Sequence, residues 1–423
     1  MKSVGICSLG CKVNTYESEF VKNELIKAGY EIKDFSSVCD VYIINTCTVT
    51  NQSDSKSRKM INSAVRRNPN ACIVAMGCFV SLNMDNLNCS VDIVIGNKDK
   101  SLIVKLLDEY FNRKEKIVRY YKDRLDTFED MYIDDFPGRT RAFVKIQDGC
   151  DNFCSYCIIP YVRGKCRSKD CDKVISEVTS LVQNGYKEVV LTGIHTGNYG
   201  NDLDISFADL LKKLIKIDNL YRLRISSIEV TELNDEVLDL LKNSNILVDH
   251  LHIPLQAGSD FILKKMNRKY DMNYYIDKIN KIRKIRPLIS ISTDVIVGFP
   301  YESDLLFNET IENCKKIGFS KIHVFPYSER KNTAASFMKE KISDVVKKER
   351  ARKLIEVSKE LEISYMNKFL GSKVEVLIEN EKDGYSYGHT GNYLYVKIKG
   401  SYKSNSLVSV HIVDVLYPYC IGE

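Results

Sequence analysis

The stretch Gly149-Cys-Asp-Asn-Phe-Cys-Ser-Tyr-Cys-Ile-Ile-Pro-Tyr161 places Cys150, Cys154 and Cys157 directly after a strand-like run. Three thiolates in this C-x3-C-x2-C spacing can hold three irons of a [4Fe–4S] cluster, which leaves the fourth iron open to a small molecule. Zinc is the alternative, but it favours paired C-x2-4-C halves, and no second pair stands nearby at that spacing. The stretch therefore predicts an iron–sulfur cluster with one open iron.

Residues 141–365 surround this loop with a repeating pattern of strand and helix. In barrels built from such units the chemistry lies on loops that follow the strands, and the cysteine loop follows the first strand. We therefore expect an open or partial (β/α)6 barrel. The six strand-like runs are FVKIQDG, EVVLTGI, RLRISSI, HLHIPL, ISTDVIVGF and KIHVFPY.

Residues 1–105 predict a separate α/β domain with a parallel sheet, because short apolar strands alternate with helical patterns. Asn14 followed by Glu17 has the spacing of a capping box, which predicts that a helix begins there. The expected strands are VGICSL, VYIINT, CIVAMG and VDIVIG, and KSLIVKLLDEYF is expected to form the closing helix.

Three further cysteines each come just after one of these N-terminal strands: Cys11, Cys47 and Cys78. The ends of parallel strands share one edge of a sheet, and ligands of open α/β sheets bind at that edge. We therefore expect the three thiols to converge and to hold a second cluster. The alternative is three unrelated cysteines in loops.

Residues 106–140 are charged and weakly patterned, which predicts a linker, and residues 366–423 alternate as a small β-barrel of about five strands. Within this barrel, Tyr395, Lys397 and Lys399 share one face of a strand. An aromatic ring flanked by lysines suits base stacking and phosphate contact. A solvated strand face is the alternative.

Composition places few limits on function. The 423 residues are 44% hydrophobic and 28% charged, as in ordinary globular proteins. No run approaches the roughly 20 apolar residues of a membrane span, and the first residues lack a signal-peptide pattern, so we expect a cytoplasmic protein without membrane contact. Fourteen cysteines in such a chain favour metal or thiol chemistry over disulfides. The net charge of +6 is a mild indication of an anionic partner.

The cysteine loop, with Tyr156 before its last cysteine, resembles the signature of radical S-adenosylmethionine (SAM) enzymes. The whole chain is similar to the radical SAM methylthiotransferases, whose order is an N-terminal methylthiotransferase domain, a radical SAM core and a C-terminal TRAM RNA-binding barrel. The resemblance rests on the cysteine loop together with LGCKVNTYES from Leu9, NTCTVT from Asn45, Gly77-Cys78, HIPLQAGS from His252 and TDVIVGFP from Thr293.

Short motifs separate the members of this family by substrate. Gly10-Cys-Lys-Val-Asn14 and LTGIHTGNYG from Leu191 resemble the members that act on N6-threonylcarbamoyladenosine at position 37 of tRNA. The alternatives are the same chemistry on N6-isopentenyladenosine-37 of tRNA or on an aspartate of ribosomal protein S12. The alternative from another class of protein is a zinc-containing RNA-binding protein without catalytic activity. This alternative predicts a colourless protein without iron.

The resemblance implies two [4Fe–4S] clusters and two uses of SAM. One SAM methylates a sulfur associated with the cluster on Cys11, Cys47 and Cys78. The second binds the cluster on the 149–161 loop, and its adenosyl radical removes hydrogen from C2 of the adenine. Side chains alone cannot activate this C–H bond, so a cofactor must carry the chemistry. The reaction also requires an electron donor such as flavodoxin or ferredoxin, and a sulfur source.

The resemblance also suggests SAM contacts, and the run after the loop suggests RNA contacts. At Thr192-Gly193-Ile194-His195 this chain lacks the glutamate with which the superfamily often holds the methionine amine of SAM, so that contact has no assigned residue. The expected SAM contacts are Tyr156, Gly193, Ser227, Glu229, Asp294 and Gly298. The expected phosphate contacts near the active site are Arg163, Lys165 and Arg167.

Overall fold

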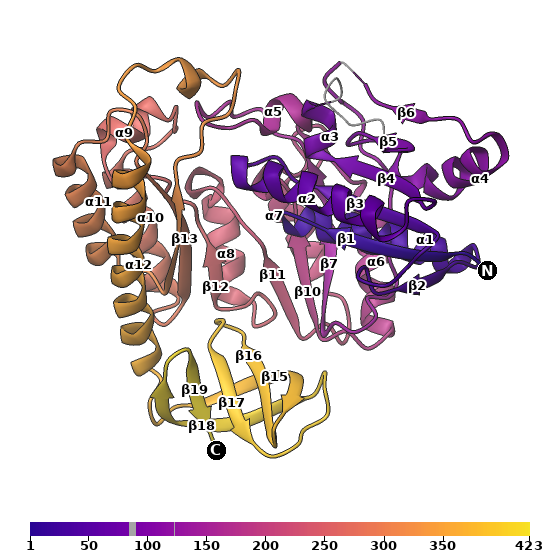
Figure 1. The fold of residues 1–423 in the computed structure, drawn as a ribbon. Coiled ribbons are helices and arrows are strands. Elements are labelled where there is room, and N and C mark those ends of the chain that lie inside the picture. Colours follow the sequence, from indigo (N-terminus) through magenta and orange to yellow (C-terminus); the bar gives the residue numbers. More distant parts are fainter. Residues whose placement is uncertain (84–89, 122) are drawn as a thin grey trace.

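The computed structural model describes residues 1–83, 90–121 and 123–423. Figure 1 shows three parts in chain order: an α/β part, a central strand–helix part and a small β-barrel. The α/β part packs on one side of the central part, and the barrel lies beneath it. Among the described residues, no helix combines the length and the apolar character needed to cross a membrane.

The N-terminal part is a six-stranded parallel sheet with strand order β2-β1-β3-β4-β5-β6. Side chains of β3, near the middle of the sheet, point alternately into two cores: Ile43 packs on the α1 side and Ile44 on the α2 side. The strands are β1 (Ser3–Ser8), β2 (Glu31–Lys33), β3 (Val41–Thr46), β4 (Cys72–Gly77), β5 (Ile93–Ile95) and β6 (Ile117–Arg119); the helices are α1 (Lys12–Lys27), α2 (Asn51–Arg67), α3 (Cys78–Leu82) and α4 (Ile103–Arg113).

Two N-terminal expectations need correction. The predicted capping box at Asn14 is wrong, because α1 begins at Lys12 and the Asn14 amide donates instead to the carbonyls of Leu9 and Thr46. The boundary at residue 105 is too early, because α4 runs to Arg113 and β6 joins the sheet. The rest of the expected linker packs on the core through buried Met131, Ile133 and Phe136.

The central part contains all six expected strands, joined by helices. The first three form a parallel sheet in the order β7-β10-β11, and the last three form one in the order β12-β13-β14. Beyond β11, Leu223 of that strand forms a parallel β-bridge with Leu247. This confirms the partial (β/α)6 barrel. The strands are β7 (Arg141–Lys145), β10 (Glu188–Thr192), β11 (Arg222–Ile225), β12 (His250–His252), β13 (Ser290–Val297) and β14 (Lys321–Pro326).

The helices and short strands that accompany the barrel complete the central part, and most pack apolar faces against its strands. The helices are α5 (Ile159–Val162), α6 (Cys171–Gln183), α7 (Phe207–Leu214), α8 (Asp235–Asn243), α9 (Asp260–Lys265), α10 (Met272–Ile285), α11 (Asp304–Ile317) and α12 (Asp344–Asn367). A two-residue antiparallel pair, β8 (Gln147–Asp148) and β9 (Arg167–Ser168), frames the cysteine loop.

The C-terminal part is a closed five-stranded barrel in the order β15-β16-β17-β19-β18, as the alternating pattern predicted. Leu394, Val396 and Ile398 point into its core, and α12 connects the barrel to the central part. The strands are β15 (Lys373–Lys382), β16 (Tyr385–Thr390), β17 (Tyr395–Lys399), β18 (Leu407–Leu416) and β19 (Tyr419–Gly422).

Candidate active site

The cysteine loop follows β8 and turns sharply at Gly149. This glycine has a φ of +72°, and a Cβ there would lie 1.9 Å from the backbone oxygen of Lys165, so only glycine fits. Cys150, Cys154 and Cys157 are all half-buried. Burial, followed by the neighbouring Cys154 sulfur, raises the pKa of Cys157 to about 12. Crowded thiols of this kind lose their protons when they bind metal, and three of them fit the donor set of an iron–sulfur cluster.

Two cationic side chains lie beside this loop. The Arg268 guanidinium donates a hydrogen bond of 3.3 Å to the Cys154 sulfur and forms an ion pair with Glu229. A ring nitrogen of His195 lies 3.8 Å from the Cys150 sulfur, and its other ring nitrogen contacts Glu232. Although burial lowers it, hydrogen bonds with Cys150 and Glu232 raise the pKa of His195 to about 10. Positive charge therefore surrounds sulfurs that would carry negative charge in a cluster.

The three N-terminal cysteines come together at one edge of the sheet. Cys11 caps α1 after β1, Cys47 follows β3, and Cys78 begins α3 after β4. A Cβ on Gly10 would lie 2.9 Å from the Cys47 sulfur, so the first two loops touch. Burial raises the pKa of the Cys78 thiol, and the Cys11 sulfur adds to the rise. The structure thus brings together three thiols that the sequence separates, in a donor set that fits a second cluster.

A buried ion network joins the N-terminal part to the central part. The carboxylate of Glu17, which is fully buried on α1, lies 3.0 Å from Lys100, 3.0 Å from Lys145 and 3.1 Å from Arg163. Burial raises the pKa of Glu17, but the three cations outweigh this and hold it well below its usual value. The network fixes α1, and with it the loop of Cys11, against the central part.

The same network corrects two of the expected RNA contacts. Arg163 is 0% exposed and Arg167 is 2% exposed, and both guanidinium groups form ion pairs with Asp148. A buried arginine that is already paired with a carboxylate cannot reach an RNA phosphate. Arg163 instead donates to the side chain of Asn14, beside Cys11. Only Lys165 of the three is exposed.

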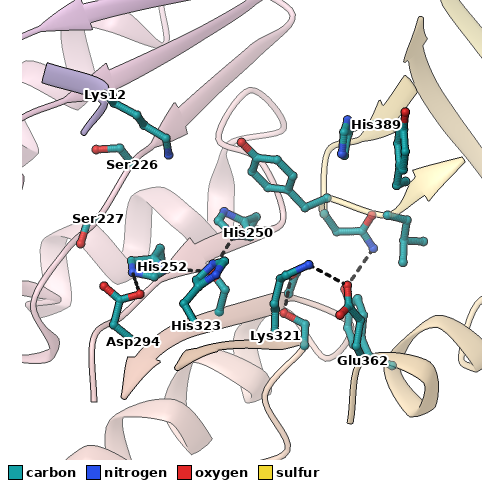
Figure 2. A pocket seen from close by; sticks show the side chains of 18 of the residues that line it. Lys12, Ser226, Ser227, His250, His252, Asp294, Lys321, His323, Glu362 and His389 are labelled. Carbon is teal, nitrogen blue, oxygen red and sulfur yellow. Dashed lines mark hydrogen bonds and ion pairs between the residues drawn. The ribbon is translucent and has the colours of Figure 1, made fainter. Parts of the chain in front are cut away.

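One cavity of about 810 Å³ lies where the three parts meet, and it is wide enough for a modified nucleoside. The N-terminal part contributes Cys11 and Lys12, and the strand ends of the central part contribute most of the opposite wall (Figure 2). The barrel closes the remaining side with the loop between β16 and β17. Barrel residues in the lining are His389, Asn392, Tyr393, Leu394, Tyr395 and Pro418.

The expected SAM contacts divide into two groups. Gly193, Ser227 and Asp294 line the cavity. The other three lie outside its lining: Glu229 pairs with Arg268 beside the cysteine loop, the Tyr156 ring packs edge-on against Phe299 at 6.4 Å, and Gly298 turns with a φ of +71°. Three of the six expected SAM contacts therefore line the cavity, and all six remain a prediction.

Neither His323 nor Lys12, which both line the cavity, was assigned a role from the sequence. His252 and His323 lie with Asp294 on its wall, with 3.4 Å between His252 and Asp294, and these side chains lie together in Figure 2. Lys12 projects from the start of α1, and burial together with Arg224 and Arg141 lowers its pKa to about 8. Its position directly after Cys11 was the signal available in the sequence.

On the barrel, Tyr395 lines the cavity and stacks on His389, with ring centroids 4.6 Å apart and an interplanar angle of 18°. Lys397 lies over the ring of Tyr385 at 3.9 Å, and Lys399 is exposed. The three residues therefore follow one face from the cavity to the solvent.

Comparison with known proteins agrees with this architecture. The Radical SAM superfamily matches residues 144–314, and the uncharacterized protein family UPF0004 matches residues 3–96. A threonylcarbamoyladenosine tRNA methylthiotransferase MtaB of Bacillus subtilis is 42% identical over 100% of this chain and 96% of its own length. The MtaB protein of Aquifex aeolicus is 41% identical over 96% of this chain and 98% of its own length.

More distant similarities extend the comparison. A tRNA-2-methylthio-N(6)-dimethylallyladenosine synthase of a Thermoanaerobacter species is 35% identical over 88% of this chain and 80% of its own length. The solved radical SAM methyltransferase TsrM of Kitasatospora setae shares the fold, with a TM-score of 0.57 and 14% identity over 79% of this chain and 75% of that one.

The fold and the cysteine loop define a protein that binds SAM at a [4Fe–4S] cluster. With relatives of 35–42% identity over almost its whole length, the chain belongs to the radical SAM methylthiotransferase family. It is a transferase whose family uses SAM and [4Fe–4S] clusters.

Proposed function

We propose that the protein transfers a methylthio group to C2 of N6-threonylcarbamoyladenosine at position 37 of tRNA. The observation that carries this proposal is the single cavity that Cys11, the strand ends of the central part and the barrel line together. The activity for which the B. subtilis and A. aeolicus relatives are named supports the choice of nucleoside. The dimethylallyladenosine relative is less similar, at 35% identity.

Six cysteines would hold the two clusters. Cys150, Cys154 and Cys157 would ligate the SAM-binding cluster, and Cys11, Cys47 and Cys78 the auxiliary one. The first three are half-buried, Cys47 and Cys78 are buried, and Cys11 is exposed. When bound, these groups supply the one-electron chemistry and the sulfur that side chains lack. Tyr156, Gly193, Ser227, Glu229, Asp294 and Gly298 would hold SAM between the loop and the cavity.

The protein's own residues place and isolate the reacting groups. The Glu17 network holds the Cys11 loop against the central part, where Cys78 packs against Ile158, the residue after Cys157. Arg268 and His195 would offset the negative charge of the cluster on the 149–161 loop. Tyr393 in the loop between β16 and β17 and Tyr395 at the start of β17 line the cavity, where they would shield a bound nucleoside from water.

The C-terminal barrel would act as a TRAM-like RNA-binding module. Tyr395 at the cavity would stack on a base, while Lys397 and Lys399, with Lys165 on the central part, would approach phosphates. We further propose that a flavodoxin or ferredoxin supplies electrons, that a separate sulfur source restores the auxiliary cluster, and that the enzyme works in the cytoplasm.

Mass spectrometry of tRNA nucleosides tests the function. A host that lacks this activity is compared with and without the gene. We expect threonylcarbamoyladenosine to become its 2-methylthio derivative only when the gene is present. A change in isopentenyladenosine instead would overturn the substrate but keep the chemistry. No nucleoside change in cells with intact iron–sulfur assembly would overturn the RNA substrate and direct attention to the aspartate of ribosomal protein S12.

A further inference from the structure

Lys12 is a cavity residue that the reaction described above does not use. It is the first residue of α1, directly after Cys11, and it lines the cavity together with Ser226 and His250 (Figure 2). Its side chain therefore lies on the wall that carries Cys11, and a substrate in the cavity would lie next to it.

The described residues provide no partner for this charge. Lys22 and Lys27, on the same helix, pair with Glu19 and Glu24, but no ion pair within residues 1–83, 90–121 and 123–423 includes Lys12. The carboxylate of Asp294 on the cavity wall attracts Lys12 electrostatically, but it lies 3.4 Å from a ring nitrogen of His252. A half-buried cation without a partner is costly, so an anion from outside the chain would stabilise it.

The neighbours of Lys12 make the region more positive. Arg224 is fully buried, and its contacts are Glu188 at 2.7 Å and the carbonyl of Gly391 at 3.0 Å. Its Nη2 has no hydrogen-bond partner among the described residues. Glu188 also pairs with Arg222 at 3.5 Å, and Arg222 pairs in addition with Glu375 at 3.4 Å. These guanidinium groups thus have carboxylate partners, whereas Lys12 has none among the described residues, and a carboxylate from outside the chain would supply one.

Among the candidate substrates, threonylcarbamoyladenosine carries such a group. Its N6 substituent ends in the carboxylate of threonine, whereas the isopentenyl group is uncharged. We propose that Lys12 binds the threonyl carboxylate of the substrate and thereby selects threonylcarbamoyladenosine over uncharged modified adenosines. This inference rests on the proposed function and deepens it, because it assigns the recognition of the N6 substituent to one residue of this chain.

The test uses purified enzyme that carries both clusters, with anticodon stem-loop RNA of two kinds. One RNA has the threonyl carboxylate at position 37, and the other has the isosteric threoninamide, which is neutral. We expect wild-type enzyme to lose about 30-fold or more in kcat/KM on the amide, as expected when one member of a desolvated charge pair is removed. Lys12→Gln should lose a similar factor on the acid and should no longer distinguish the two RNAs.

Two further variants keep the test decisive. Lys12→Arg keeps the charge and should keep the preference for the acid, even if Lys12→Gln fails to retain its clusters. Lys27→Gln, at the exposed end of the same helix, should behave as wild type. Iron content is measured for each variant.

Three results would overturn the proposal: a wild type that treats acid and amide alike, a cluster-loaded Lys12→Gln that still prefers the acid, or an equal loss on both RNAs. The last would mean that Lys12 binds an RNA phosphate or the carboxylate of SAM. A wild type that converts neither RNA would instead overturn the proposed function itself.

Discussion

At the scale of the residue, the six cysteines form two separate sets of thiols. Both sets are buried or half-buried except for exposed Cys11. Cys154 and Cys150 raise the pKa of Cys157, and Cys11 raises that of Cys78. Among the other cysteines that the structure describes, Cys314 is fully buried in the core and behaves as a small apolar residue. Metal binding should therefore depend on the two trios alone.

Alanine substitution of one cysteine from either trio should remove the cluster of that trio only. We expect Cys150→Ala and Cys11→Ala each to keep about half of the iron of the reconstituted wild type, since each [4Fe–4S] cluster needs its thiolates. Both variants should lose methylthiolation. Iron and sulfide analysis measures the first effect, and nucleoside mass spectrometry measures the second.

Cys7→Ala, in β1 and outside both trios, is the matched control and should keep the full iron content. A Cys150→Ala variant that retains both clusters and full activity would contradict the assignment.

The buried carboxylate of Glu17 should contribute to the stability of the folded protein. Removing one partner of a buried ion pair leaves the other charges uncompensated, so we expect Glu17→Gln to lower the free energy of unfolding by about 3–5 kcal/mol. Glu24→Gln, which removes an exposed pair with Lys27, should cost less than about 1 kcal/mol. Urea unfolding followed by circular dichroism compares the two, and equal losses would refute the role of the network.

The same carboxylate predicts a dependence of stability on pH. Its pKa in the folded protein lies below its ordinary value of 4.5, so its contribution is present above pH 4.5 and is lost as the pH falls further. Wild-type stability should thus change little through this group between pH 7 and 5, and should fall below pH 4.5. Glu17→Gln should show a shallower fall, and parallel curves for both proteins would contradict this explanation.

At the scale of the element, the loop after β8 depends on one glycine. Gly149→Ala would place its Cβ 1.9 Å from the backbone oxygen of Lys165, so the loop must move. We expect this variant to lose the SAM-binding cluster, and with it about half of the iron. Gly185→Ala, also at positive φ but with nothing within 4 Å, separates backbone strain from the collision. Equal iron in the two variants and the wild type would show that the loop tolerates the change.

The face of β17 predicts two distinguishable effects on RNA binding. Tyr395→Ala should weaken binding by about 1–3 kcal/mol at all salt concentrations, because stacking is lost. Lys399→Ala should instead reduce the salt dependence of the binding constant by about one phosphate contact. Fluorescence anisotropy over a salt series measures both. If the binding constants of wild type and Lys399→Ala depend on salt with the same slope, Lys399 does not contact the RNA.

At the scale of the whole molecule, the sequence predicted what depends on local pattern. β3 and β4 are mostly apolar and buried throughout, and β13 is mostly buried. In contrast, β2 and β6 have three residues each, of which two are exposed. Parallel strand ends were enough to bring Cys11, Cys47 and Cys78 together, because sheet geometry is general.

Contacts between the parts could not be predicted from local pattern. Arg163 reads as a surface residue until Glu17, 146 positions earlier, is packed against it. In the same way, Lys12 becomes a cavity residue only when the barrel loop with Tyr393 lies on the other side. These features depend on how the parts dock, which no window of the sequence records.

If the proposed function is right, this cavity holds the adenine with its C2–H bond as the site of reaction. The most direct measurement uses reconstituted enzyme, SAM and an anticodon stem-loop RNA whose threonylcarbamoyladenosine carries deuterium at C2. We expect a 2-methylthio product in the RNA that has lost this deuterium, and one deuterium in the 5′-deoxyadenosine formed from SAM. A methylthiolated product without deuterium in 5′-deoxyadenosine, or an RNA that keeps its deuterium, would contradict it.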